Sequence, residues 1–194
     1  MRATAVAVLP LLLALAGLIA ARPVPATAKS LDELWALLRG GGQIVLLRHG
    51  TTTLGVGDPQ GFRLDECATQ RNLTDAGRDE SRRVGAAFRA QRVPVGRVLS
   101  SPWCRCLETA RLAFGRAEPW PALANLFGRQ ERADALRAAL SELPTDDTLV
   151  LVSHGSTISS ATGVMPAMGE FVVVTPRGGG RFTVAGRIPP SALP

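Results

Sequence analysis

The chain holds only two histidines, and each of them follows an apolar run and precedes a glycine. His49 lies in the stretch IVLLRHG, directly after Arg48, and His154 lies in the stretch TLVLVSHG. A third polar cluster, Ser101 to Arg105, follows the stretch GRVLS. A neutral imidazole can act as a nucleophile or carry a proton, and a guanidinium group matches the oxygens of a phosphate. These residue types favour chemistry on a phosphoryl group.

Each cluster taken alone also has a structural explanation, because a histidine at a strand end more often satisfies local hydrogen bonds than it catalyses a reaction. The combination favours function. Two separate apolar runs end in His-Gly, and a third delivers Arg105 at the start of a predicted helix. Glycine lets the backbone approach a ligand closely, and helix N-termini attract anions.

The segments that must position these clusters are apolar strands alternating with amphipathic helices. Strands are expected at 43–48, 96–101 and 148–153, with a closing hairpin at 171–175 and 181–188; helices are expected at 30–39, 74–91, 103–114, 129–143 and 156–163. Ser30, Thr74 and Ser156 are predicted to cap three of these helices. Residues 51–72 show no sustained period, which indicates a long loop, and such loops are usually functional.

This alternation predicts the α/β class, as a three-layer sandwich: a mainly parallel sheet with helices on both faces and a C-terminal β-hairpin. In such sheets ligands bind outside the carboxyl ends of the strands. His49, Ser101 and His154 all stand at such ends. We therefore expect the three polar clusters to meet at one edge of the sheet.

The N-terminal segment differs in character from the rest of the chain. Arg2 is followed by the apolar run AVAVLPLLLALAGLIAA, and Ala26-Thr27-Ala28 resembles a signal-peptidase site. We expect residues 1–28 to be a signal peptide and residues 29–194 to form a single domain, periplasmic or secreted, with no stable membrane association after signal removal. The alternative is an uncleaved membrane anchor, although Pro10 interrupts the apolar run.

The net charge and the cysteines limit the classes of binding partner and metal site that the chain is expected to have. The formal charge is +6, but the arginines are spread along the chain without interleaved aromatic residues, so no nucleic-acid partner is expected. The three cysteines do not have a zinc spacing, and we expect neither a metal nor a cofactor. In an oxidising compartment, Cys67 can form a disulfide with either Cys104 or Cys106.

Four motifs carry a resemblance to a known family: LLRHG, NLTDAG at 72–77, SPWCRCLETA at 101–110 and LVSHG at 151–155. Together, over about residues 43–175, they resemble the histidine phosphatase superfamily, in its phosphoglycerate mutase-like branch. The resemblance implies a metal-independent phosphatase in which His49 attacks phosphorus and forms a phosphohistidine. Arg48, Arg105 and His154 would hold the phosphoryl oxygens, and Gly50 and Thr51 would contribute to substrate binding.

The family also uses an acid that protonates the leaving oxygen, and here the sequence departs from its pattern. Asn125 stands in the segment PALANLFG, where the mutase branch has a glutamate, and Gly155 follows His154, where another branch has an aspartate. Glu170 is our predicted acid, with Asp65 and Glu66 as further candidates. The substrate is expected to be a small phosphomonoester or an activated phosphate, and the alternative function is a non-catalytic phosphate-binding domain.

Overall fold

A computed structural model describes residues 29–125, 130–142 and 146–194 of the chain, and it has the predicted α/β architecture. The predicted signal peptide, residues 1–28, lies outside the described residues, as do both predicted ends of the helix at 129–143. Among the described residues, no helix is long and apolar enough to cross a membrane.

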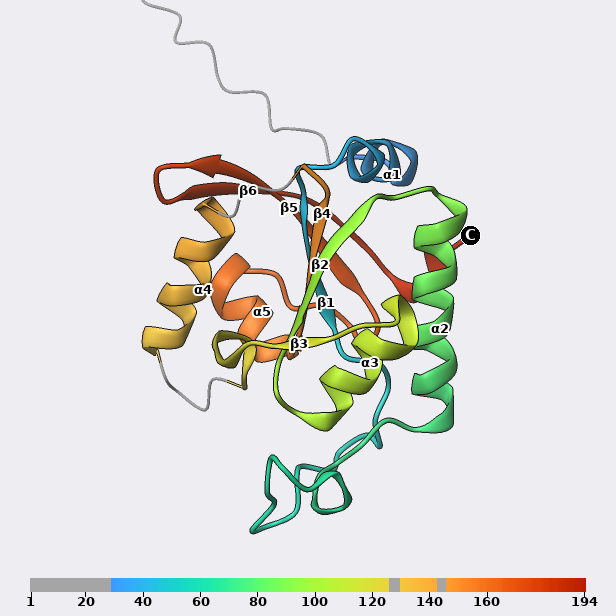
Figure 1. Ribbon diagram of the computed structural model, residues 1–194, viewed down its shortest axis with the longest axis vertical. Helices are drawn as coiled ribbons and strands as arrows, with labels where there is room; N and C mark the ends of the chain where they lie inside the picture. Colours follow the sequence, from blue (N-terminus) through green and yellow to red (C-terminus); the bar gives the residue numbers. More distant parts are fainter. Residues whose placement is uncertain (1–28, 126–129, 143–145) are drawn as a thin grey trace, which may run out of the picture.

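A six-stranded sheet forms the middle layer, in the order β3-β2-β4-β1-β5-β6 (Figure 1). The strands are β1 (Ile44–Arg48), β2 (Val95–Ser100), β3 (Glu118–Pro119), β4 (Thr148–Ser153), β5 (Phe171–Gly178) and β6 (Arg181–Ile188). The first four strands run parallel to one another, whereas β5 runs antiparallel to β1 and forms the predicted hairpin with β6. All six residues of β4 are buried, as its unbroken apolar run predicted.

Helices cover both faces of this sheet: α1 (Leu31–Arg39), α2 (Asp75–Ala90) and α3 (Cys104–Phe114) lie on one face, and α4 (Gln130–Glu142) and α5 (Gly155–Thr162) on the other (Figure 1). Successive side chains of a strand point to opposite faces. Val45 and Leu47 of β1 accordingly join the core under α1, α2 and α3, and Ile44 and Leu46 join the core under α4 and α5. The predicted three-layer sandwich is confirmed.

Two of the three predicted helix caps are present. Ser30 forms a capping box with Glu33, and the Thr74 hydroxyl accepts a hydrogen bond from the Gly77 amide. The cap predicted at Ser156 is wrong, because α5 begins at Gly155 and His154, two residues before Ser156, occupies its N-cap position. The Ser156 hydroxyl donates to the Asn125 side chain instead. His154 is therefore held where a strand ends and a helix begins.

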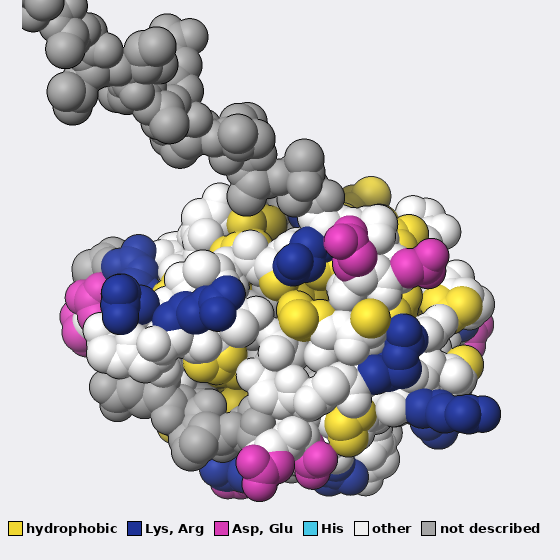
Figure 2. Space-filling view, turned by 90° about the horizontal axis from the view of Figure 1, so that it is seen from above, with side chains coloured by type: hydrophobic (Ala, Val, Ile, Leu, Met, Phe, Trp, Pro, Cys, Tyr) yellow, Lys and Arg dark blue, Asp and Glu magenta, His cyan; other side chains and the backbone are white. Residues whose placement is uncertain are grey.

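The predicted loop joins β1 to α2 and lies beyond the carboxyl ends of the parallel strands (Figure 1). It contains one short 3-10 helix, η1 (Cys67–Thr69), and a bridge pairs Thr52 with Leu73 at its two ends. Cys67 forms a disulfide with Cys104, which leaves Cys106 as a buried thiol. The opposite end of the molecule shows scattered arginines mixed with acidic side chains, and no histidine is visible on that face (Figure 2).

Candidate active site

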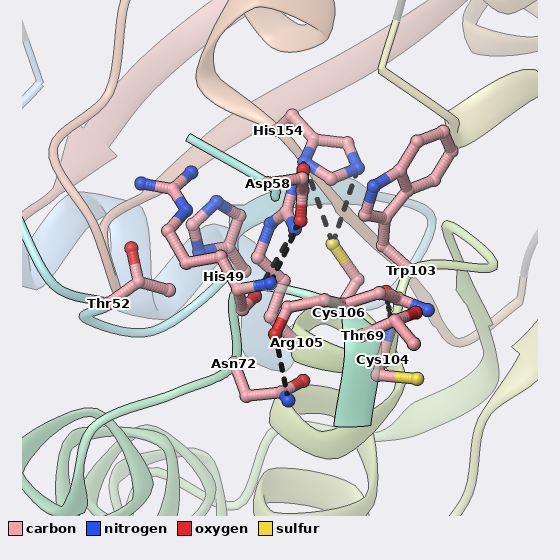
Figure 3. A network of polar contacts seen from close by, with 12 residues as sticks. His49, Thr52, Asp58, Thr69, Asn72, Trp103, Cys104, Arg105, Cys106 and His154 are labelled. Carbon is pink, nitrogen blue, oxygen red and sulfur yellow. Dashed lines mark hydrogen bonds and ion pairs between the residues drawn. The ribbon is translucent and has the colours of Figure 1, made fainter. Parts of the chain in front are cut away.

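The predicted polar clusters converge at the carboxyl ends of β1, β2 and β4 (Figure 3). His49 directly follows β1, Ser101 follows β2, and His154 follows β4. The His49 and His154 rings lie with their centroids 5.5 Å apart. Both residues are almost completely buried, with 2% and 3% of their surface exposed. The sheet therefore brings together the two histidines of the chain, as the strand pattern predicted.

Hydrogen bonds fix the orientation of the His49 ring. Its Nδ1 lies 2.8 Å from the carbonyl oxygen of Gly50. A carbonyl can only accept, so Nδ1 carries the proton and donates it to this bond. In the neutral ring the lone pair then lies on Nε2, which is the arrangement that a nitrogen nucleophile needs.

His154 is oriented by two other side chains. The Arg105 guanidinium donates to its Nδ1 at 3.4 Å, and its Nε2 lies 2.8 Å from the Ser101 hydroxyl oxygen. Because Nδ1 accepts, the proton of the neutral ring is on Nε2 and is donated to Ser101. The indole of Trp103 packs against this ring edge to face, at a centroid distance of 5.4 Å.

Both imidazoles are held in the neutral form. Burial lowers the pKa of His49 to about 3, with further lowering by the charges of Arg105, Arg48 and Arg71, against the opposing hydrogen bond to Gly50. Burial, then the charge of Arg105, lowers the pKa of His154 well below its usual value. Desolvation and nearby positive charge both disfavour an imidazolium ion, so the two histidines add no charge to the site.

Three arginines supply the positive charge, and each has a buried donor available. The Nε atoms of Arg48, Arg71 and Arg105 are buried and have no hydrogen-bond partner among the described residues. An unpaired buried donor is costly, so these three donors are available to a group that the site binds. Three of them around a neutral histidine indicate a site for an oxyanion.

Arg105 itself is 1% exposed and stands in the first turn of α3. Its NH1 group donates to the Asp58 carboxylate at 2.8 Å and to the Arg71 carbonyl at 3.3 Å. Arg48 donates through NH1 to the Pro166 carbonyl at 2.8 Å. A Cβ on Gly155 would lie 3.1 Å from the Arg48 guanidinium carbon, so the glycine after His154 makes room for this arginine.

Arg71 and Asp58 were not predicted from the sequence as site residues. Both lie in the long loop, where no period predicts the direction of a side chain. The Arg71 amide donates to Asp58 at 3.0 Å, and the Asp58 carboxylate reaches Arg105 across 47 positions of sequence. Arg71 immediately precedes the NLTDAG motif, and this position next to a recognised motif could have identified it as a site residue. Nothing comparable marked Asp58.

Gly50 and Thr51, predicted to bind substrate, have their polar groups engaged within the protein. The Gly50 amide donates to Thr109, and its carbonyl accepts from His49. The amide and hydroxyl of Thr51 both donate to the Glu80 carboxylate. A Cβ on Gly50 would come within 2.6 Å of the Gly77 carbonyl oxygen, so close packing against α2 requires this glycine. These contacts position His49 and engage the hydrogen-bond donors of Gly50 and Thr51 within the protein.

Glu170, the predicted acid, is completely buried and its carboxylate is already occupied. It accepts from the Arg187 guanidinium at 2.5 Å and from the Ala167 amide at 2.7 Å. Both carboxylate oxygens are thus already bound by groups of the protein, so these contacts argue for a structural role. Asp65 and Glu66 lie on the exposed side of the loop, where both pair with Arg63.

Comparison with known proteins shows what the chain is similar to in sequence and in fold. The family model described as "Histidine phosphatase superfamily (branch 1)" matches residues 44–127. A sequence search of curated proteins finds no match.

Among solved structures, the chain is similar to the protein histidine phosphatase SixA complexed with tungstate, with 24% identity and a TM-score of 0.59 over 78% of this chain and 99% of that one. A putative alpha-ribazole-5'-P phosphatase from Escherichia coli is 16% identical, with a TM-score of 0.56 over 74% and 94% of the two chains. A mutant phosphoserine phosphatase from Entamoeba histolytica, in complex with phosphoserine, is also 16% identical, with a TM-score of 0.56 over 78% and 99%. These likenesses establish the fold.

Proposed function

We propose that this chain, which belongs to the histidine phosphatase superfamily, hydrolyses a small phosphorylated substrate through a phosphohistidine formed on His49. One observation carries the proposal. His49 is a neutral imidazole with its lone pair on Nε2, and it stands among arginines whose buried Nε donors have no partner among the described residues. A nucleophile and an oxyanion site thus occupy the same place.

In the proposed reaction Nε2 of His49 attacks phosphorus while the bond to the leaving oxygen breaks. Arg48, Arg71 and Arg105 hold the equatorial oxygens, which is the main contribution a protein makes to phosphoryl transfer. The hydrogen bond from Nδ1 to the Gly50 carbonyl keeps the ring oriented and stabilises the positive charge that develops on it. Water then attacks the phosphohistidine, releases inorganic phosphate and returns the electron pair to Nε2.

The low pKa of His49 supports this role. A histidine with a pKa of about 3 is unprotonated at neutral pH, so the nucleophile requires no prior loss of a proton. Burial also raises the strength of the arginine charges on the bound phosphoryl group, since the site has a low effective dielectric constant.

The substrate class that we propose is a phosphomonoester or an activated phosphate. Asn125 and Gly155 stand where the two family branches carry an acid, so a substrate with a good leaving group fits this chain. The structural neighbours include a protein histidine phosphatase and a phosphoserine phosphatase, so the fold occurs with an activated phosphate and with a phosphomonoester as substrate. Metal independence is part of the proposal, because the arginines provide the charge neutralisation.

We further propose that the enzyme is exported, with residues 1–28 as a cleaved signal peptide. The Cys67–Cys104 disulfide supports this location, since disulfides persist mainly in oxidising compartments. Intact mass of the protein recovered from the periplasm or medium tests the proposal: a chain that begins near Lys29 is expected, and a full-length chain in the membrane fraction contradicts it.

The test of the phosphatase is turnover of p-nitrophenyl phosphate by residues 29–194, beside His49→Ala, with alkaline quenching to preserve a phosphohistidine. The wild type is expected to turn over and to yield a labelled adduct, and the variant to lose both. Tungstate binding by the variant is the control for folding, because the arginines remain. A wild type that binds tungstate without turnover or adduct would instead be a phosphate-binding domain.

A further inference from the structure

Asp58 forms an ion pair with Arg105, one of the arginines that bind the phosphoryl group in the proposed mechanism (Figure 3). Its carboxylate accepts from Arg105 at 2.8 Å and from the Arg71 amide at 3.0 Å. The two paired side chains are 1% and 8% exposed, so this ion pair is shielded from solvent. A phosphoryl oxygen and the Asp58 carboxylate compete for the same guanidinium group.

The segment that carries Asp58 has the composition of a movable loop. Gly55, Gly57 and Gly61 surround it, and a Cβ added at any of them would meet nothing within 4 Å. Leu54 and Val56 are 77% and 50% exposed, so this part of the loop buries little apolar surface. Few buried contacts mean a low cost of local displacement. Asp58 can therefore leave Arg105 when an anion arrives, while the loop stays anchored through Cys67.

Displacement changes the protonation of Asp58. In the free protein, burial acts to raise the pKa of this carboxyl, and the hydrogen bond and charge of Arg105 outweigh it and lower the pKa. When a phosphoryl group takes Arg105, the carboxyl loses that partner and gains a neighbouring negative charge, and both changes favour the protonated acid. The charged groups that face it are Arg105 from α3 and Arg71 from the loop.

The other buried carboxylates of the region are committed elsewhere. Glu170 pairs with Arg187, and Glu80 accepts from the Thr51 amide and hydroxyl. Asp65 and Glu66 lie at the surface, where both pair with Arg63. Among the described carboxylates, Asp58 is the one whose hydrogen-bond partner is itself an arginine of the oxyanion site.

We propose that Asp58 is the general acid and base of this site, released for that task when the substrate displaces it from Arg105. The inference rests on the proposed phosphohistidine mechanism. In the first step the His49 Nε2 lone pair forms the bond to phosphorus, the ester P–O bond breaks, and the leaving oxygen takes the proton of the Asp58 carboxyl. In the second step the carboxylate takes a proton from water, which attacks phosphorus, and the P–N pair returns to His49.

The proton comes from the medium or from the substrate monoanion, since the second pKa of a phosphate monoester lies near 6. Each cycle thus consumes one ester and one water and restores both His49 and the Asp58 carboxyl. In this proposal the acid that is missing at positions 125 and 155 comes instead from the loop between β1 and α2.

The test compares Asp58→Asn with the wild type on p-nitrophenyl phosphate and on glycerol phosphate, together with tungstate binding. Without the competing charge, Asp58→Asn is expected to bind tungstate more tightly. It is expected to lose about a hundredfold or more in kcat on glycerol phosphate, whose alkoxide needs a proton, and less than about tenfold on p-nitrophenyl phosphate. Asp65→Asn is the matched control, in the same loop and exposed, and should behave as the wild type.

Equal losses on the two substrates, or weaker tungstate binding, would mean that Asp58 only supports the structure of the site. A kcat that is unchanged or higher on glycerol phosphate would make Asp58 an inhibitory contact and overturn the inference. In both cases a phosphohistidine on His49 would still form, so the proposed function would survive. A wild type that yields no adduct would remove the proposed function itself, and the acid with it.

Discussion

The rings of His49 and His154 lie edge to face, with centroids 5.5 Å apart and planes at 68°, although one follows β1 and the other caps α5. Two imidazolium ions at this separation would repel each other in a buried site that already holds arginines. Arg105 donates to His154, and the Gly50 carbonyl accepts from His49. The pair is therefore stable only while both rings are neutral.

This relationship predicts how stability depends on pH. Both histidines have folded pKa values below the ordinary value of 6.5, with His49 at about 3. Below pH 6.5 the unfolded chain binds protons that the folded protein does not, so acid favours unfolding. The free energy of unfolding should fall as the pH drops from about 6.5 toward 3, by up to about 1.4 kcal/mol per pH unit for each histidine. Chemical denaturation across this range measures the slope.

The control for that slope is His49→Gln, which cannot titrate and retains an amide that can donate to the Gly50 carbonyl. The variant should show a smaller loss of stability between pH 6.5 and 4 than the wild type. An equal slope would mean that His49 binds a proton as readily in the folded protein as in the unfolded chain, contrary to its burial.

The Asp58–Arg105 pair predicts a coupled effect of mutation. Arg105→Met leaves a carboxylate without its ion partner and should cost about 3 kcal/mol of folding free energy. The double variant Asp58→Asn/Arg105→Met removes both charges and should recover part of that loss. Both should lose tungstate binding, because the oxyanion site lacks Arg105 in each. Denaturation curves and tungstate titration give the two readouts.

An exposed pair elsewhere provides the comparison. The NH2 group of Arg97 lies 2.7 Å from the Glu118 Oε1 atom, but the two side chains are 61% and 59% exposed. Arg97→Met should cost less than about 1 kcal/mol and leave tungstate binding intact. If Arg97→Met and Arg105→Met cost the same, burial does not distinguish the two pairs.

Gly77 predicts a steric effect that opposes helix propensity. It lies in the first turn of α2, where alanine would ordinarily favour the helix by about 1 kcal/mol. A Cβ there would lie 2.1 Å from the Thr51 carbonyl oxygen, which is too close for any atom. Gly77→Ala should therefore destabilise the protein by about 1–3 kcal/mol and shift the backbone next to His49, with a loss of p-nitrophenyl phosphatase activity.

Gly57→Ala is the control for that variant, because its added Cβ would meet nothing within 4 Å. It should change the melting temperature little, and it serves as a control for stability alone because Gly57 adjoins Asp58. A stabilised Gly77→Ala would show that α2 can move away from Thr51 and that the tight approach is not required.

The sequence predicted the fold well because the central strands β1 and β4 are buried on both faces. In 148–153 every residue is apolar or small, and such a run has few alternatives to a central parallel strand. The positions of His49, Arg105 and His154 followed from the strand ends. The cap at Ser156 was wrong because the choice between neighbouring cap positions depends on tertiary contacts, here the hydrogen bond from Ser156 to Asn125.

The parts of the site that the sequence did not predict come from the loop and from long-range pairing. Asp58 reaches Arg105 through a loop without periodicity, and no local rule gives its direction. Glu170 was a reasonable acid by its place before β5, but its partner Arg187 lies on β6 and becomes a neighbour only when the hairpin closes. The choice between Cys104 and Cys106 for Cys67 likewise needed the orientation of α3.

The Cys67–Cys104 disulfide predicts a redox effect on stability and on the site. It closes a segment of 37 residues and ties the loop of Asp58 to the residue before Arg105, so its loss should cost about 4 kcal/mol. Thermal unfolding with and without dithiothreitol measures this: the wild type should melt lower when reduced, and Cys104→Ser should melt low under both conditions. Cys106→Ala keeps the disulfide and should retain the full response to reductant. The prediction is wrong if the wild type, with its disulfide fully reduced as thiol titration shows, melts at the same temperature as the oxidised protein. The loop is then held by its other contacts, among them the hydrogen bond from the Cys104 amide to Gln70.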